Sequence, residues 1–370
     1  NVNEKGLIEY GDFAPEPKIT VTKNDLSNGL DFIKLPDSLD KVTFMVMKET
    51  ENLRKTYVLN RGLYNLTMNE VKPMTPNSVM PIKENDANRL DLAKWFFDDD
   101  NPLTSRVVVN RLWQQFFGVG IVATPDDFGT QGNRPINPKL LDWLAVTYKD
   151  YDKWDTKSFI KRIVMSSTYK QSSFTSDKNY DLDPENVYLS RYPRQKLSAE
   201  MIRDNILKSS GLMVNKLGGP SVKPYQPDGL WIEKNSFSAD LYNYKKNSGD
   251  SLYRRGMYTF LKRTSPPPSM IALDGTSREE CTVKREKTNT PLQALVLMND
   301  PQFFEASRIL AERIQTEGGK NYSDQIKYGF RLAISRYPKD EELKLLNDQA
   351  SYNQQQSNTL ENNETTRRAF

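Results

Sequence analysis

The most informative feature of this 370-residue chain is what it lacks, because it contains no histidine and only one cysteine, Cys281. Without histidine it cannot build a Ser-His-Asp or Cys-His nucleophile site, a histidine-ligated zinc or iron centre, or a Cys-x-x-Cys-His haem attachment. One cysteine cannot form an internal disulfide, so it says nothing about the redox compartment. The composition therefore excludes most familiar hydrolase and metalloenzyme mechanisms, and we predict no metal site.

Charge and hydropathy also lack a strong bias. The 52 basic and 48 acidic side chains are interspersed along the chain, and nucleic-acid binding, which needs a basic face, is not favoured. No apolar run approaches the roughly 20 residues that cross a bilayer, so we expect no membrane-spanning segment. The chain opens at Asn1 without an initiator methionine or a leader. We interpret it as a processed product or a piece of a longer precursor.

The first part of the chain alternates short β-like runs with Asn-Asp and Asn-Gly turn signals, which predicts a β-rich N-terminal segment over residues 1–70. Three prolines then indicate an extended linker over residues 71–85. The predicted strands of the N-terminal segment are Lys18–Val21, Asp31–Leu35, Val42–Met47 and Thr56–Leu59.

From residue 86 the pattern changes to helices with explicit first and last residues, which predicts a helical domain over residues 86–345. Gly118 and Gly318 stand where left-handed or turn conformations end two of these helices. The helix starts are marked by Asn101-Pro102, Asn137-Pro138, Asp155, Thr290-Pro291 with Gln293, and Asp300-Pro301. Periodicity disappears over residues 215–251, an irregular insertion of the kind that is often functional. We expect a frayed C-terminal tail over residues 346–370. The fold class is therefore α+β, mainly α.

Carboxylates and cations are the remaining candidates for chemistry. Asp126 and Asp127 form a loop pair beside aromatic residues, although turn and cap roles are more common for such pairs. On the helix that follows Pro102, a polar stripe could line a groove, and its arginines could bind carboxylate, sulfate or phosphate. Solvent exposure is the ordinary explanation of such a stripe. The ligand-binding candidates are Arg106, Asn110, Arg111 and Gln114 on the stripe, Tyr225 and Trp231 in the insertion, and Arg263 and Arg285 near Cys281.

Several long strings are similar to a known family. They include Asn101-Pro102-Leu103-Thr104-Ser105-Arg106, Asn110-Arg111-Leu112-Trp113-Gln114-Gln115, Thr124-Pro125-Asp126-Asp127-Phe128-Gly129, Thr288-Asn289-Thr290-Pro291-Leu292-Gln293-Ala294-Leu295 and Asn299-Asp300-Pro301-Gln302-Phe303. Over roughly residues 40–345 the chain resembles the C-terminal domain of unknown function in secreted planctomycete-type cytochrome-c-associated proteins, which also occur in Bacteroidetes-like bacteria. The agreement of several ordered strings is more specific than any single short motif.

The resemblance implies an exported protein, in the periplasm or at the cell surface, whose complete form often carries an N-terminal c-type cytochrome module. It also implies a link to polysaccharide utilisation, but no established reaction. Haem c would then belong to a domain outside this chain, which has no cofactor of its own. Asn137 stands where relatives commonly have histidine, and Gln114-Gln115-Phe116 replaces a stretch that often contains one. An activity that needs those imidazoles would be absent here.

Three hypotheses about function follow, and they leave open whether the chain is an enzyme. The first is an accessory or binding module of an exported assembly that binds a glycan or a protein partner. The second is a polysaccharide-acting hydrolase with paired carboxylates, Asp126 or Asp127 among them, and arginines for an acidic sugar. The third is a scaffold that docks a c-type cytochrome domain for electron transfer.

Overall fold

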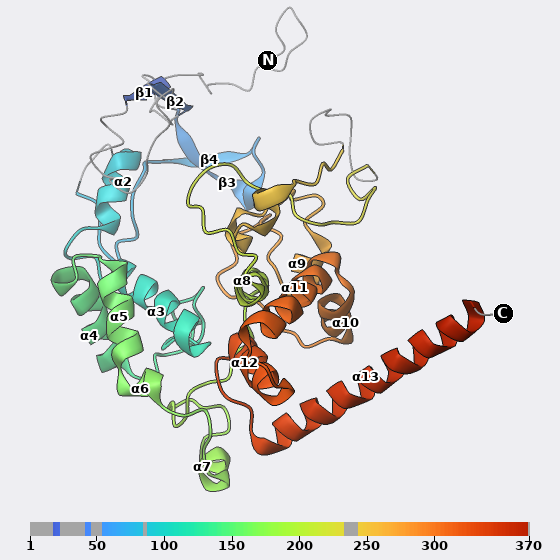
Figure 1. The fold of residues 1–370 in the computed structure, drawn as a ribbon. Helices are drawn as coiled ribbons and strands as arrows, with labels where there is room; N and C mark the ends of the chain where they lie inside the picture. The colour runs from blue at the N-terminus through green and yellow to red at the C-terminus, as the bar shows by residue number, and fades with distance from the viewer. Residues whose placement is uncertain (1–17, 23–40, 46–53, 84–86, 233–242, 369–370) are drawn as a thin grey trace, which may run out of the picture. The chain divides into compact units, whose positions relative to one another are not determined.

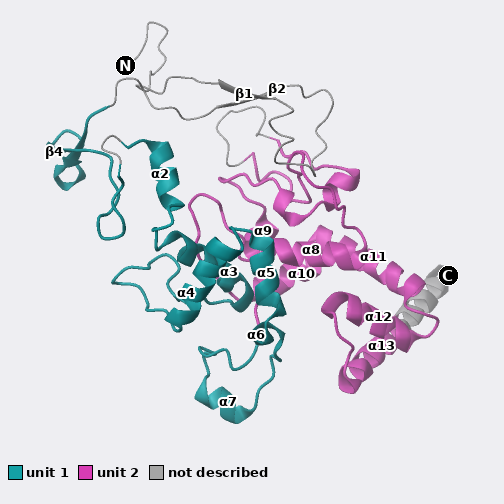
Figure 2. Ribbon diagram, turned by 90° about the vertical axis from the view of Figure 1, so that its left-hand side faces the viewer, with its two compact units in different colours: residues 1–193 teal, residues 194–370 magenta. Residues whose placement is uncertain are grey.

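The chain forms two compact units, residues 1–193 and 194–370 (Figure 2). The computed structural model describes residues 18–22, 41–45, 54–83, 87–232 and 243–368. The boundary at residue 193 falls inside the single helical domain predicted over 86–345, because each unit closes around an apolar core of its own. The predicted fold class is confirmed, since the structure is mainly helical with small strand pairs near its N-terminus (Figure 1).

The strands form two antiparallel pairs. The first pair is β1 (Lys18–Thr22) with β2 (Lys41–Met45), and the second is β3 (Thr56–Leu59) with β4 (Thr67–Val71). Three of the predicted strands are confirmed within a residue or two of their predicted bounds, whereas the predicted strand Asp31–Leu35 lies outside the described residues.

Six helices of unit 1 follow the strands in its described part. They are α2 (Arg89–Phe96), α3 (Thr104–Phe117), α4 (Pro138–Val146), which continues into a π-turn over Thr147–Tyr151, α5 (Thr156–Met165), α6 (Ser167–Lys170) and α7 (Asp177–Leu182). The predicted capping residues act as expected: Asn137 accepts from the backbone of Leu140, and Asp155 accepts from Lys157. The core of this unit forms where α3, α4 and α5 meet, around Val109, Leu144 and Phe159.

Unit 2 is also helical. Its helices are α8 (Ala199–Ser210), α9 (Pro268–Ala272), α10 (Pro291–Asn299), α11 (Pro301–Glu317), α12 (Tyr322–Ile334) and α13 (Asp340–Arg368). Helix α8 packs against α9, α11 and α12 (Figure 1). The predicted capping box of Thr290 and Gln293 is present, and Asp300 caps α11 through the backbone of Gln302. The core of this unit contains Ala199, Met270, Leu273 and Phe303.

Two buried arginines hold the irregular insertion, predicted over residues 215–251, against the helices of unit 2. Arg254 donates to backbone carbonyls of residues 216–220. Arg203 on α8 donates to the Leu252 carbonyl oxygen at 2.7 Å, and burial lowers its pKa to about 10, so it stays charged at neutral pH. Buried charges need such partners. The described part of the insertion is therefore held by these side chains together with a short backbone bridge between Val222 and residues 258–260.

The C-terminal part differs from expectation. The sequence predicted a frayed tail over residues 346–370. The structure instead has the single helix α13, which packs on α12 and continues through Arg368 (Figure 1). The physical reason is composition. Residues 340–368 contain no glycine or proline, and their glutamate, glutamine, leucine and lysine side chains are good helix formers.

Candidate functional site

A pocket of about 650 Å³ opens in unit 1, and we call it the unit 1 pocket. Its walls come from the second half of α3, the turn after it, the start of α4, one residue of α6 and the loop after α7. The lining residues are Trp113, Phe117, Val119, Gly120, Ile121, Ala123, Ile136, Asn137, Leu140, Thr168, Glu185, Asn186, Val187, Tyr188, Leu189 and Pro193. Most of them are apolar or aromatic, which is typical of small-ligand sites.

The turn that forms one wall is fixed from within. Gly118 ends α3 with a φ of 83°, a conformation that favours glycine. The Asn110 side chain then clamps Val122: its Nδ2 donates to the Val122 carbonyl at 3.0 Å, and its Oδ1 accepts from the Val122 amide at 2.8 Å. Gly120 lies so close to this clamp that an added Cβ would come within 2.6 Å of the Asn110 Nδ2. The wall is therefore rigid.

The loop over residues 183–193 forms the opposite wall and is held by its own polar groups. The buried Asp183 carboxylate accepts from the backbone amides of Val187 at 2.7 Å and Tyr188 at 3.1 Å. Arg191 donates to two carbonyl oxygens at the start of this loop. The Tyr192 hydroxyl donates to the Phe116 carbonyl oxygen on α3. This network fixes the backbone that carries Tyr188, whose side chain remains 80% exposed.

The pocket combines aromatic surface with a few polar groups. Trp113 stacks on Phe117 with ring centroids 4.2 Å apart and stays partly accessible. Thr168 offers a half-buried hydroxyl, and Glu185 offers an exposed carboxylate. Glu185 is the single charged side chain among the lining residues, and none of them is lysine or arginine. Such an arrangement suits a ligand with apolar faces and polar edges.

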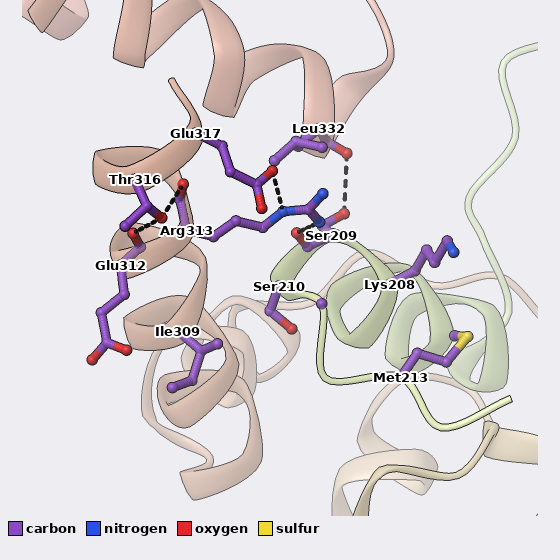
Figure 3. A pocket seen from close by; sticks show the side chains of 11 residues that line it. Lys208, Ser209, Ser210, Met213, Ile309, Glu312, Arg313, Thr316, Glu317 and Leu332 are labelled. Atoms are coloured by element: carbon purple, nitrogen blue, oxygen red, sulfur yellow. Dashed lines mark hydrogen bonds and ion pairs between the residues drawn. The ribbon is translucent and has the colours of Figure 1, made fainter. Parts of the chain in front are cut away.

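A second pocket, of about 740 Å³, lies in unit 2 between the C-terminal end of α8, α11 and α12 (Figure 3). Its polar side chains mainly form hydrogen bonds and ion pairs with neighbouring protein groups. Arg313 donates to Glu317 and to the Ser209 carbonyl oxygen, both at 3.0 Å, and Glu312 pairs with Arg308. Cations at a helix C-terminus are stabilising. We therefore interpret this cleft as a helix-end contact and take the unit 1 pocket as the candidate site.

The structure does not gather the predicted polar stripe of α3 into a groove. Arg106 pairs with Asp142 on α4 at 2.7 Å, and Arg111 is exposed. Gln114 is half-buried, and its Oε1 has no hydrogen-bond partner within the part of the chain that the structure describes. Asn110 is 0% exposed and turned inward, because neighbouring elements cover that side of the helix.

The loop carboxylates take part in a turn. Asp127 Oδ1 accepts from the backbone amide of Gly129 at 2.7 Å, and the Asp127 carbonyl accepts from the Thr124 hydroxyl at 2.8 Å. Asp126 is exposed. Neither carboxylate lines the unit 1 pocket. This arrangement is the ordinary turn chemistry of aspartate.

The candidates in unit 2 also lie apart from one another. Trp231 is only 2% exposed and packs edge-to-face on Tyr244 at 5.0 Å, so it fills the space beneath the irregular insertion. Tyr225 is half-buried under the Lys246 ammonium group, 4.3 Å from the ring centroid. Arg263 is exposed. Arg285 pairs with Glu200 on α8 at 2.7 Å, and not with the acidic residues next to it in sequence.

The comparisons with known proteins give one family. The family of proteins of unknown function named PSD1, or DUF1553, matches residues 88–350, which is most of the chain. The chain belongs to this family. No curated protein and no solved structure matches it. The DUF1553 region contains both pockets.

In this DUF1553 domain, the string that begins at Thr288 builds a polar network with Asp274. The Lys196 ammonium donates to Asp274 Oδ2 at 3.0 Å, to the Thr288 carbonyl at 2.7 Å and to Gln293 Oε1 at 2.6 Å. Asp274 also accepts from the Thr288 amide and hydroxyl. Burial alone would raise the pKa of Asp274, but the hydrogen bonds from Thr288 and Lys196 outweigh it and lower the pKa to about 2. This network fixes the segment at Thr288 that leads into α10.

Two further features concern membrane-spanning helices and metal-binding groups. Across the described ranges, no helix of the DUF1553 chain has the length and apolar character needed to cross a membrane. The same ranges hold no group of three acidic or cysteine side chains placed to bind a metal ion.

Sequence reasoning missed three residues of the candidate site: Trp113, Glu185 and Tyr188. Trp113 entered only as part of a family string, and the loop over residues 183–193 carried no predicted role. A signal was present, because an aspartate before a proline, as in Asp183-Pro184, often starts a turn. A tyrosine soon after such a turn is a candidate for exposure.

Proposed function

We propose that this chain is a glycan-binding module whose ligand occupies the unit 1 pocket. The observation that carries the proposal is the pair of aromatic side chains there. Tyr188 is 80% exposed on a loop held by Asp183, and Trp113 stands on α3 in the same lining. Exposed aromatic rings on a fixed backbone cost little conformational entropy when they bind.

Sugars suit this lining for a chemical reason. A pyranose ring has C–H faces that pack on aromatic rings and hydroxyl edges that need hydrogen bonds. Trp113 and Tyr188 supply the apolar surface, and Thr168 and Glu185 supply a hydroxyl and a carboxylate. Ligand pockets commonly combine apolar walls with a small number of polar groups that fix the orientation of the ligand.

The ionisable groups of the unit 1 pocket agree better with binding of a glycan than with its hydrolysis. Glycoside hydrolysis commonly takes two carboxyl groups on opposite sides of the bond that breaks. Glu185 is the single carboxylate among the lining residues, and the sequence contains no histidine that could act as an alternative proton carrier. Asp127 instead accepts a turn hydrogen bond from Gly129.

The wider setting is part of the proposal. We propose that the module works in an exported assembly that handles polysaccharides, next to a c-type cytochrome domain that carries haem. In this proposal the chain holds no cofactor of its own, and its partners are a glycan and a protein of the assembly. The support is the sequence resemblance described above. Co-purification of a haem protein with the chain from its native source is the expected result.

Binding of oligosaccharides by the full chain, measured by calorimetry, tests the proposed site. Tyr188→Ala should weaken binding of neutral β-linked hexose oligomers by about tenfold, since stacking and burial of one aromatic ring contribute about 1–2 kcal/mol. Tyr151→Ala is the matched control, because Tyr151 is 79% exposed and lies outside the pocket lining. Equal effects of the two variants, or no binding of any oligosaccharide, would refute the proposal.

A further inference from the structure

The electrostatics of the unit 1 pocket are set by one side chain. Glu185 is the single charged residue among the lining residues. It is exposed, and no hydrogen bond or ion pair joins it to another residue in the described part of the chain. Among the described residues, the Glu185 carboxylate therefore has no direct charged partner.

The arginine of the same loop does not form an ion pair with Glu185. The Arg191 guanidinium donates to the carbonyl oxygens of Asp183 at 2.9 Å and Pro184 at 2.7 Å. It also lies 4.8 Å above the ring of Tyr180. Because Arg191 is held by these contacts, Glu185 is left to pair with a cation that arrives from solution.

The neighbours of Glu185 favour an organic cation over a metal ion. One carboxylate is a poor ligand set for a hard cation, which takes six or more oxygen atoms. Aromatic faces attract ammonium groups, and a carboxylate forms charge-assisted hydrogen bonds with them. Tyr188 and Trp113 supply the faces in the lining that also contains Glu185.

We propose that the ligand of the unit 1 pocket is a protonated amino sugar, whose ammonium group pairs with Glu185 while its ring stacks on the aromatic wall. This inference rests on the proposed function and adds the class of glycan. The proposed ligand is a positively charged sugar. The hydrolase hypothesis, in contrast, expected arginines to bind a negatively charged sugar. An acidic sugar would be repelled by Glu185.

The experiment compares three β-1,4-linked oligomers of equal length on the full chain: glucosamine, N-acetylglucosamine and glucose. The glucosamine oligomer should bind about two- to fivefold more tightly than the glucose oligomer at low salt, the range for an exposed ion pair. The preference should shrink at high salt. Glu185→Gln should abolish the preference, so that the glucosamine and glucose oligomers bind with equal affinity. Asp181→Asn, which removes an exposed charge outside the lining, should keep it.

The outcomes separate the two proposals. If the glucose oligomer binds through Tyr188 but glucosamine has no advantage, the amino-sugar inference is wrong and the glycan site stands. If Glu185→Gln retains the preference, the ammonium pairs elsewhere and the inference is also wrong. A lysine-containing peptide that binds where all three sugars fail would overturn both proposals, because the ligand would then be a protein.

Discussion

The clamp that Asn110 makes on Val122 can be tested by one substitution. Asn110→Leu keeps the branched shape and the number of heavy atoms of the side chain but removes both hydrogen bonds to Val122, at 2.8 and 3.0 Å. Asn110 is 0% exposed and Val122 is 2% exposed, so water cannot replace the lost partners. Each buried backbone group left unpaired costs about 1–3 kcal/mol. We therefore expect the free energy of unfolding of unit 1 to fall by about 2–6 kcal/mol.

Denaturant unfolding of the full chain, followed by tryptophan fluorescence, measures this loss. Four of the five tryptophans lie in unit 1, so the signal reports mainly on that unit. Arg111→Leu is the control, because Arg111 is the next residue of α3 and is exposed. Exposed substitutions of this kind usually change stability by less than about 0.5 kcal/mol.

The same variant separates a structural role from a ligand contact. If Asn110→Leu leaves the unfolding free energy unchanged while it weakens oligosaccharide binding, Asn110 acts on the ligand, as the polar stripe on α3 first suggested. The clamp would then be refuted. A loss of stability with a parallel loss of binding is the expected result, because Gly120 and Ile121 in the clamped turn line the pocket.

Three further predictions concern unit 2. Trp231→Ala should lower the free energy of unfolding of this unit by about 3–5 kcal/mol, because it empties a nearly fully buried site; calorimetry of the full chain measures it. Asp274 should make the free energy of unfolding depend on pH. Its pKa in the folded protein is about 2, below the ordinary 3.8, so its contribution to stability is present above pH about 4 and is lost as the pH falls toward 2. Acid unfolding of Asp274→Asn should lack this step, and asparagine tolerates the φ of 63° there. Arg254→Ala should speed protease cleavage within residues 216–220, whose carbonyls it binds, and an unchanged cleavage pattern would contradict that role.

Local signals in the sequence were sufficient for much of the fold. The first residues of α4, α5, α10 and α11 followed from single capping residues and prolines, because those groups act within one turn of the backbone that they satisfy. The stop at Gly118 followed in the same way. The mainly helical fold class could therefore be predicted without information about tertiary contacts.

The candidate site needed information that no local pattern holds. A stripe at every fourth residue of α3 identifies one face of the helix, but not what covers it. Asn110 finds its partner twelve residues later, at Val122. Lys196 and Gln293 are 97 residues apart in sequence and 2.6 Å apart in space. Polar residues that hold such long-range contacts resemble surface residues until their partners are known.

The absence of histidine and the form of the pocket point to the same chemistry from independent directions. The chain has no histidine, the residue that most often carries protons in active sites. The Asp127 carboxylate accepts a turn hydrogen bond from the Gly129 amide. The lining of the unit 1 pocket combines aromatic surface with one carboxylate, Glu185, which has no hydrogen-bond or ion-pair partner among the described residues. A lone carboxylate beside Tyr188 can pair with a cation, whereas glycoside hydrolysis commonly takes a second carboxyl group, as nucleophile or as base for water. We therefore infer that, in the proposed glycan site, Glu185 and the aromatic rings of the lining select the ligand by charge and stacking.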